Sequence, residues 1–405
     1  MSPDHGSEGA LGGLRVIEVC QNLAGPDCGT LLADMGADLV KVEPPGGDHS
    51  RHIGRHFAGG ESYAFMTLNR SKRSIVIDLK TDGGKSLLKE LAAGADALVE
   101  NVRPGSMDRM GLGYEDLREV NPGLIYASIS GFGRTGPYAD RGGYDLVSQG
   151  FSSLLSFTGE PGGNPVKIPV PLCDLNAGMY SAFSIVSAVL YRQRTGKGQW
   201  IDTSLTDAGL GYTVWQASQF FPSGESPVPK GTKHEISAPY QAFRCSDGAF
   251  VLGGMSQPNW ERTCRTIGRE DLLEREEYAN PKNRGLNEYA LANELEEVFE
   301  TKPRDHWIEL LQGAKVPCGP IHNMAEAFDH PQIRAREMAV EVEHPTAGKM
   351  KVLAVPPKLS ESPAEVRRPA PLLGQHTDEI LRELGKSEED IRRLRESGAV
   401  ACGRP

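Results

Sequence analysis

The 405-residue sequence lacks the features that mark several large classes of protein. Its seven cysteines are scattered, odd in number and never spaced as CxxC, which argues against a disulfide framework and against a cysteine-based zinc site. No run of five or six like charges occurs, and 44 Lys and Arg against 54 Asp and Glu give a net charge of −10. We therefore expect neither nucleic acid nor anionic lipid as a partner.

Long apolar runs are missing as well. Leu175–Tyr191, one of the two longest stretches without a charged residue, contains one asparagine and three serines, so we expect a buried helix rather than a membrane span. The N-terminal residues 1–9 are polar and acidic, without the basic and then apolar order of a secretory signal. We expect a cytoplasmic protein that does not bind membranes.

Common catalytic and nucleotide-binding motifs are absent too. The sequence contains no GxSxG, HExxH or GxGxxG, and Gly83-Gly84-Lys85-Ser86 lacks the earlier glycine of a phosphate-binding loop because Leu79 stands there. These absences argue against a serine hydrolase elbow, a zinc protease and a nucleotide hydrolase.

Short β-branched runs alternate with helical segments between Leu14 and about Leu205. This alternation predicts βαβ units and a doubly wound, mainly parallel α/β sheet. A helix is expected over Leu175–Arg194, with Asp174 as a possible N-cap and Gly196 as terminator. The expected strands are Arg15–Val19, Leu39–Val42, Ile75–Asp78, Ala97–Val99, Ile125–Ile129 and Trp200–Leu205.

The Pro-, Gly- and Ser-rich segment Pro222–Pro229 is the best candidate domain boundary. Beyond it, Pro239–Phe243 and Ala249–Leu252 resemble a hairpin, and Trp260–Thr301 is charged and helical. The sequence becomes β-like again after Met338 and ends in an amphipathic helix, which we expect over 377–397.

Asp174 is the most informative carboxylate. One interpretation is structural, because an aspartate at this place caps the helix that follows. The other is catalytic, because a helix N-terminus would keep the carboxylate ionised and the apolar approach Val170–Leu172 would limit its hydration. The two roles are compatible.

Basic residues gather in Asn69–Arg73 and in Asn101–Arg109, next to predicted strand ends. They are either solvated surface or a site for an anionic ligand at the carboxyl ends of the sheet. A third group, His49, Arg51, His52, Arg55 and His56, is either a surface loop or a site for a substrate carboxylate. Glycine-dense segments, which suit tight turns or close approach to a ligand, occupy Gly131–Pro137, Gly142–Asp145 and Gly253–Met255.

Several short motifs occur in a fixed order along the chain: Leu-Ala-Gly25-Pro26, Lys41-Val-Glu43-Pro-Pro-Gly-Gly-Asp48, Asn69-Arg-Ser-Lys-Arg-Ser74, Glu100-Asn-Val-Arg-Pro-Gly105, Asp174-Leu-Asn-Ala-Gly178, Val316-Pro-Cys-Gly-Pro320 and Leu372-Leu-Gly-Gln-His-Thr-Asp378. In these motifs the sequence resembles family III coenzyme A transferases, the CaiB/BaiF class. The resemblance runs from Leu11 to about Gly385, and within it the pattern is most similar to succinyl-CoA-dependent dicarboxylate CoA transferases.

Membership of that family implies an interlocked homodimer and a Rossmann-like large domain with a smaller inserted α+β domain. The expected parts are residues 1–220, the inserted residues 221–330, and residues 331–405 returning to the large domain. The resemblance also implies that CoA moves from an acyl-CoA to a carboxylic acid through aspartyl anhydride and aspartyl-CoA thioester intermediates on Asp174. No metal and no cofactor beyond CoA itself is expected.

By resemblance, the CoA contacts fall on Ala24, Lys72, Asn101, Val102, Arg103, Arg109 and Arg141. The remaining substrate or loop positions are Tyr144, Asp145, Gly253, Gly254 and Gln257.

Two alternatives stay open. A racemase acting on 2-methylacyl-CoA esters, from the same superfamily, has a histidine and a glutamate where this chain has Tyr144 and Gln257, and neither replacement supplies its second acid or base. A non-catalytic CoA-binding subunit would not need Asp174.

Overall fold

A computed structural model describes residues 9–401 of the chain. Cys402 and most of the N-terminal segment discussed above lie outside the described residues. The described chain forms two compact units: the first comprises residues 9–153, 168–212 and 332–401, and the second comprises residues 154–167 and 213–331. The first unit therefore contains segments from both ends of the chain, and the short segment 154–167 belongs with the second.

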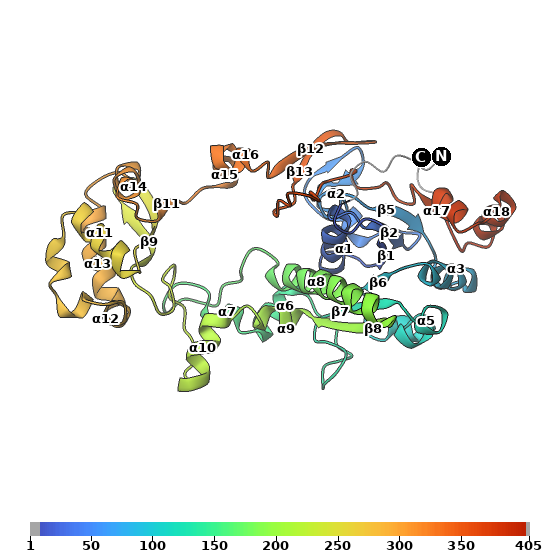
Figure 1. Ribbon diagram of the computed structural model, residues 1–405, viewed down its shortest axis with the longest axis horizontal. Coiled ribbons are helices and arrows are strands. Elements are labelled where there is room, and N and C mark those ends of the chain that lie inside the picture. The colour runs from blue at the N-terminus through green and yellow to red at the C-terminus, as the bar shows by residue number, and fades with distance from the viewer. Residues whose placement is uncertain (1–8, 402–405) are drawn as a thin grey trace. The chain divides into compact units, whose positions relative to one another are not determined.

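Six parallel strands form the central sheet of the first unit (Figure 1). Their order is β5-β2-β1-β6-β7-β8. The chain therefore adds β2 and β5 on one side of β1, and then adds β6, β7 and β8 on the other side. Every neighbouring pair is parallel, which confirms the predicted parallel α/β sheet. The direction of winding reverses between β1 and β6. The strands are β1 (Arg15–Val19), β2 (Asp38–Glu43), β5 (Arg73–Val76), β6 (Ala97–Glu100), β7 (Ile125–Ser130) and β8 (Gln199–Ser204).

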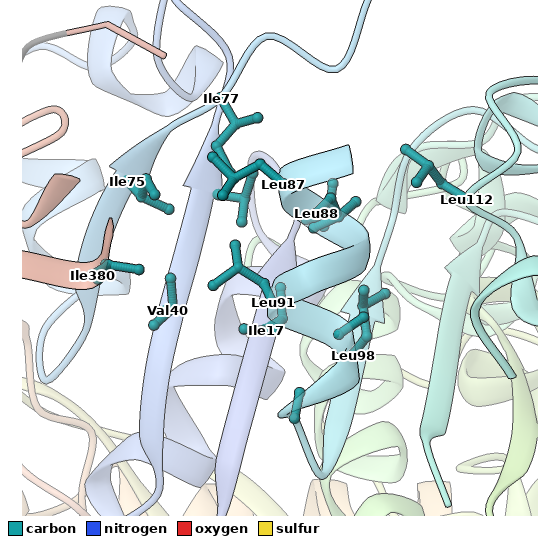
Figure 2. Close-up of a cluster of buried hydrophobic side chains, with 14 of the residues drawn as sticks. Ile17, Val40, Ile75, Ile77, Leu87, Leu88, Leu91, Leu98, Leu112 and Ile380 are labelled. Atoms are coloured by element: carbon teal, nitrogen blue, oxygen red, sulfur yellow. The ribbon is translucent and has the colours of Figure 1, made fainter. Parts of the chain in front are cut away.

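A buried apolar cluster covers one face of this sheet (Figure 2). Leu87 and Leu91, four residues apart on α3, lie on one side of that helix and pack with Ile17 of β1 and Val40 of β2. Ile380, from the C-terminal segment, joins the same cluster and so ties the end of the chain to its beginning.

Helix α8 packs against α1, β7 and β8. Its buried stripe includes Ala177, Ser181 and Ile185, spaced by four residues, whereas Phe183 is 69% and Leu190 56% exposed. The prediction of a buried helix is therefore correct for one face and wrong for the other. By length and composition α8 is also apolar enough to cross a membrane, the single such helix among residues 9–401, but core helices of soluble proteins pass that test as well.

Two helix boundaries differ from the predictions. Helix α8 begins at Leu172 with Pro171 as N-cap, so Asp174 lies inside the first turn and does not cap the helix. The expected helix over 377–397 is two helices, because Gly385 adopts φ 77° and Ser387 starts a new capping box with Asp390. The helices of the first unit are α1 (Ala24–Asp34), α2 (Tyr63–Leu68), α3 (Asp82–Ala93), α4 (Ser106–Arg109), α5 (Tyr114–Val120), α6 (Asp145–Phe151), α8 (Leu172–Thr195), α9 (Leu205–Leu210), α17 (Thr377–Glu383) and α18 (Glu388–Glu396), with a 3₁₀ turn over His49–His52.

The two small hairpins of this unit are β3 (Phe57–Ala58) with β4 (Glu61–Ser62) and β12 (Ala339–His344) with β13 (Gly348–Leu353). The second confirms the β-like pattern predicted after Met338. Met350 and Val352 on its buried side pack with Phe65 and Met66 of α2.

The second unit is built on the predicted hairpin, formed by β9 (Tyr240–Cys245) and β10 (Gly248–Gly253), with β11 (Cys318–Pro320) paired to β10. Phe243, Phe250 and Phe299 meet at its centre with ring centroids 5.0–6.4 Å apart. The helices are α7 (Leu154–Phe157), α10 (Val214–Ser223), α11 (Gln257–Thr266), α12 (Pro281–Leu286), α13 (Glu288–Phe299), α14 (Arg304–Gly313) and α15 (Met324–Asp329), with 3₁₀ turns over Glu270–Leu273 and Glu276–Tyr278; α16 (Pro331–Ala335) lies at the junction of the two units.

Candidate active site

A cavity of about 360 Å³ lies in the first unit at the carboxyl ends of β1, β6 and β7. This is the point where the winding of the sheet reverses, the usual ligand site of doubly wound folds. Asp174 is the one acidic residue and Arg103 the one basic residue in its lining. The lining residues are Gln21, Asn22, Leu23, Ala24, Asn101, Val102, Arg103, Pro104, Ile129, Ser130, Gly131, Gly142, Gly143, Tyr144, Asp174 and Leu205.

Asp174 enters this cavity from the first turn of α8. Among residues 9–401, no group donates a hydrogen bond to its carboxylate, and no basic side chain pairs with it. Burial first, and then the neighbouring carboxylates Asp145 and Asp27, raise the pKa of Asp174 to about 7. This direction runs against the expectation that the helix N-terminus keeps the group ionised, because burial and the negative neighbours both disfavour the charged carboxylate.

Asp145 performs the capping role that the sequence suggested for Asp174. Its buried Oδ1 accepts hydrogen bonds from the backbone N–H groups of Cys173 (2.9 Å) and Asp174 (3.4 Å), and its Oδ2 accepts from Gln149 Nε2 (2.7 Å). Asp145 is not in the cavity lining. The carboxylate therefore fixes the start of α8, and with it the position of Asp174.

The predicted CoA contacts Ala24, Asn101, Val102 and Arg103 all line the cavity. The amide of Asn101 is already engaged, since its Nδ2 donates to Gln21 O (2.8 Å) and its Oδ1 accepts from Gln21 N (2.8 Å). This pair joins the loops that follow β6 and β1. Helix α1 begins beside it without a side-chain cap, which leaves early backbone N–H groups of the helix near the cavity.

Lys72 does not lie in the cavity lining, in contrast to the prediction. It is fully buried, pairs with Glu18 Oε2 (2.8 Å), and donates to Pro26 O (2.7 Å) and Asn69 Oδ1 (3.0 Å). Its neighbours in the sequence are paired as well, Arg70 with Asp34 and Arg73 with Asp38, Glu379 and Glu383. The basic cluster 69–73 is therefore a set of structural ion pairs.

Arg109 and Arg141 also lie outside the lining. Arg109 is exposed and donates to Ser106 Oγ (3.0 Å), whereas the guanidinium of Arg141 stacks over the ring of Tyr138 at 3.8 Å. In the third basic group, Arg51 is buried and bonded to Glu43 and Glu61, while His52, Arg55 and His56 are exposed.

The remaining predicted positions, Gly253, Gly254 and Gln257, belong to the second unit. The N–H of Gly253 donates to Pro317 O (2.8 Å), so this backbone group is not free to contact a ligand. The Oε1 of Gln257 accepts a hydrogen bond from the buried Arg284 (2.8 Å), and this contact fixes the position of the Gln257 side chain. Tyr144 is 75% exposed at the rim of the cavity in the first unit.

Sequence reasoning missed Gln21, Asn22, Ser130 and Leu205. The first three lie at or just after the carboxyl ends of strands β1 and β7, and that position was the available signal. Among residues 9–401, no group of three His, Cys, Asp or Glu side chains is arranged to hold a metal ion.

Residues 11–377 match the sequence profile of CoA-transferase family III. The chain belongs to this family. It is 37% identical over 392 residues to the succinyl-CoA:glutarate CoA-transferase of Homo sapiens (96% of this chain, 90% of the relative), and 38% identical over 386 residues to the succinyl-CoA:mesaconate CoA-transferase of Haloarcula hispanica (93% and 97%). The crystal structure of a CAIB/BAIF family protein from Brucella suis superposes with a TM-score of 0.82 at 38% identity and covers 93% of this chain and 100% of that one.

Proposed function

We propose that this family III enzyme transfers CoA from succinyl-CoA, or a similar acyl-CoA, to a dicarboxylic acid, with Asp174 as the nucleophile. The observation that carries the proposal is the unpaired carboxylate of Asp174 in the cavity at the switch point of the sheet. A carboxylate without a hydrogen-bond donor or counter-ion retains its basicity and is available to attack an electrophile.

The reaction runs through four acyl transfers that balance without a redox step. The Asp174 carboxylate attacks the thioester carbonyl, the C–S bond breaks, and a mixed anhydride and CoA thiolate form. The thiolate attacks the aspartyl carbonyl and releases the donor acid, which leaves CoA as a thioester on Asp174. The acceptor carboxylate then attacks that thioester, and the thiolate returns to the acceptor carbonyl, which frees Asp174 and yields the new acyl-CoA.

Several groups of this chain support those steps. Asp145 holds the first turn of α8, so that the attacking oxygen is oriented before the substrate arrives. The uncapped start of α1 offers backbone N–H groups to negative charge that develops in the cavity, and Arg103 supplies its one cation. Because thioester energy is conserved at every step, we propose that no metal and no cofactor besides CoA takes part.

The choice of dicarboxylate rests on the relatives. Glutarate and mesaconate, which the names of two relatives give as acceptors, both carry two carboxylates. We propose in addition that the exposed group His52, Arg55 and His56, which lies outside the cavity lining, supplies basic side chains for the second carboxylate. The six described cysteines are free thiols, which supports a reducing, cytoplasmic compartment.

An acceptor panel tests the proposed reaction. With succinyl-CoA as donor, we expect glutarate and mesaconate to give their CoA esters, measured by mass spectrometry, at rates at least about tenfold above acetate, because acetate has no second carboxylate for the proposed contact with His52, Arg55 and His56. Free CoA should not accumulate. Preference for a monocarboxylate would contradict the dicarboxylate assignment, and no transfer with any pair would contradict the reaction itself.

We further propose that two chains form an interlocked homodimer. The outer face of α8 exposes Met179, Phe183 and Leu190 in the first unit, and α10 has no buried residue in the second. Apolar faces of this kind favour association. Sedimentation equilibrium at micromolar concentration should give twice the 43.9 kDa chain mass; a stable and active monomer would refute the dimer.

A further inference from the structure

The loop between β1 and α1 forms one wall of the cavity. Gln21, Asn22 and Leu23 of this loop, together with Ala24 at the start of α1, belong to the cavity lining. Asn22 adopts φ 64°, a left-handed conformation that is uncommon for residues other than glycine. The loop therefore needs contacts from elsewhere to hold its shape.

Those contacts come from buried side chains distant in sequence. Lys41 Nζ donates to Cys20 O (3.0 Å), Asp48 Oδ1 accepts from the N–H of Asn22 (3.1 Å), and Lys72 Nζ donates to Pro26 O (2.7 Å). Lys41, Asp48 and Lys72 are each 0% exposed, and none of them lines the cavity. Together they hold the backbone on both sides of the left-handed residue.

The same side chains form a buried network of ion pairs with Glu18. Glu18 pairs with Lys41 through Oε1 (2.8 Å) and with Lys72 through Oε2 (2.8 Å), and Lys41 also pairs with Asp48 Oδ2 (2.7 Å). Two buried cations thus face two buried carboxylates. A buried ion is tolerated only with its partners in place, so each member restricts the positions of the others.

Asp48 occupies the key position in this set, because both of its oxygens are used. Oδ2 pairs with Lys41, while Oδ1 accepts from Asn22 N–H and from the Ser50 hydroxyl (2.8 Å) and N–H (2.8 Å). An amide has a single acceptor oxygen. An asparagine at this position can satisfy the cation or the loop, but not both.

We infer that Asp48 is a positioning residue of the acyl-CoA site, which it shapes through Lys41 and the N–H of Asn22 without touching the substrate. The inference rests on the proposed function and adds a buried residue that lies outside the cavity lining. A loop that contacts CoA equally in the ground and transition states affects binding rather than chemistry.

The variant Asp48→Asn tests this role against a matched control, Asp34→Asn. Asp34 is also 0% exposed and pairs with a cation, Arg70 (2.8 Å), and a serine hydroxyl, Ser71 (2.8 Å), but it touches no residue of the loop. We expect Asp48→Asn to raise the KM for succinyl-CoA, and the Kd for CoA in calorimetry, about tenfold with kcat changed less than threefold. Asp34→Asn should lower thermal stability to a similar extent and leave both constants within twofold. Equal effects of the two variants on KM, or no effect of Asp48→Asn, would overturn the inference.

Hydrogen exchange on the wild-type protein provides a second readout if Asp48→Asn does not fold. A peptide covering residues 20–26 should exchange at least about tenfold more slowly than the exposed loop 52–57 before any ligand is added, because the buried groups already hold it. Equal exchange of the two segments would contradict a preset loop. Calorimetry with CoA and hydrogen exchange need no turnover, so failure of the inference is distinct from failure of the proposed reaction, which the acceptor panel reveals.

Discussion

Replacement of Asp174 by asparagine should lower kcat/KM for CoA transfer by more than about 10³-fold, because an amide is neutral and far less nucleophilic than a carboxylate. The change is nearly isosteric, and the cap of α8 stays intact because Asp145, not Asp174, accepts the first N–H groups of that helix. We therefore expect a folded variant that binds CoA normally. Initial rates with succinyl-CoA and glutarate, together with calorimetry, measure both properties.

Asp82→Asn is the matched control, since Asp82 is also a first-turn aspartate but belongs to α3, away from the cavity. Its activity should equal that of the wild type. Wild-type enzyme incubated with acyl-CoA and no acceptor should carry CoA on the peptide that contains Asp174, released by hydroxylamine. Normal turnover by Asp174→Asn, after mass spectrometry has shown that the asparagine is not deamidated, would return Asp174 to a purely structural role.

Strands β1, β2, β5, β6 and β7 were predictable because each is a short run rich in β-branched and other apolar residues and is buried almost throughout, whereas β8 is half-exposed along its length. The prediction Leu39–Val42 lies inside β2, Asp38–Glu43, and the run Arg15–Val19 is β1 itself. The same pattern places Asn101 and Gly131 directly after strands, and thus at the edge of the sheet where the cavity lies. Local periodicity carries this information, so tertiary contacts were not needed to find it.

The roles of the charged residues were not predictable, because they depend on partners far away in the sequence. Lys72 and Arg103 are both basic residues beside strands, but Glu18 lies next to Lys72, whereas no acidic residue pairs with Arg103 in the described part of the chain. In the same way, Asp145 is 28 residues from the N–H of Cys173 that it caps. A sequence shows which groups are charged, and only the fold shows which charges are already neutralised.

The acidic limb of the pH profile should lie near neutrality. Burial, Asp145 and Asp27 raise the pKa of Asp174 to about 7, and only the ionised carboxylate attacks. We therefore expect kcat/KM to fall by about 50-fold from pH 7 to pH 5, with a slope that approaches tenfold per pH unit well below the pKa, since this constant reports ionisations of the free enzyme. Initial rates at saturating acceptor measure the profile. Asp27→Asn removes one of the negative neighbours and should move the limb to lower pH, whereas Asp82→Asn should not move it.

The contribution of Asp174 to the free energy of unfolding should change with pH in the direction opposite to the activity. A carboxylate whose pKa is higher in the folded state favours folding when protonated, so this contribution is present below the unfolded pKa of 3.8 and is lost as the pH rises through about 7. Asp174→Asn, which is neutral throughout, should then be more stable than the wild type at pH 8, by up to about 4 kcal/mol, and nearly equal to it at pH 4. Urea unfolding at the two pH values measures the difference. Equal stability of the two proteins at pH 8, combined with an activity limb near pH 4, would show that Asp174 ionises like an exposed aspartate and that its surroundings do not retain its basicity.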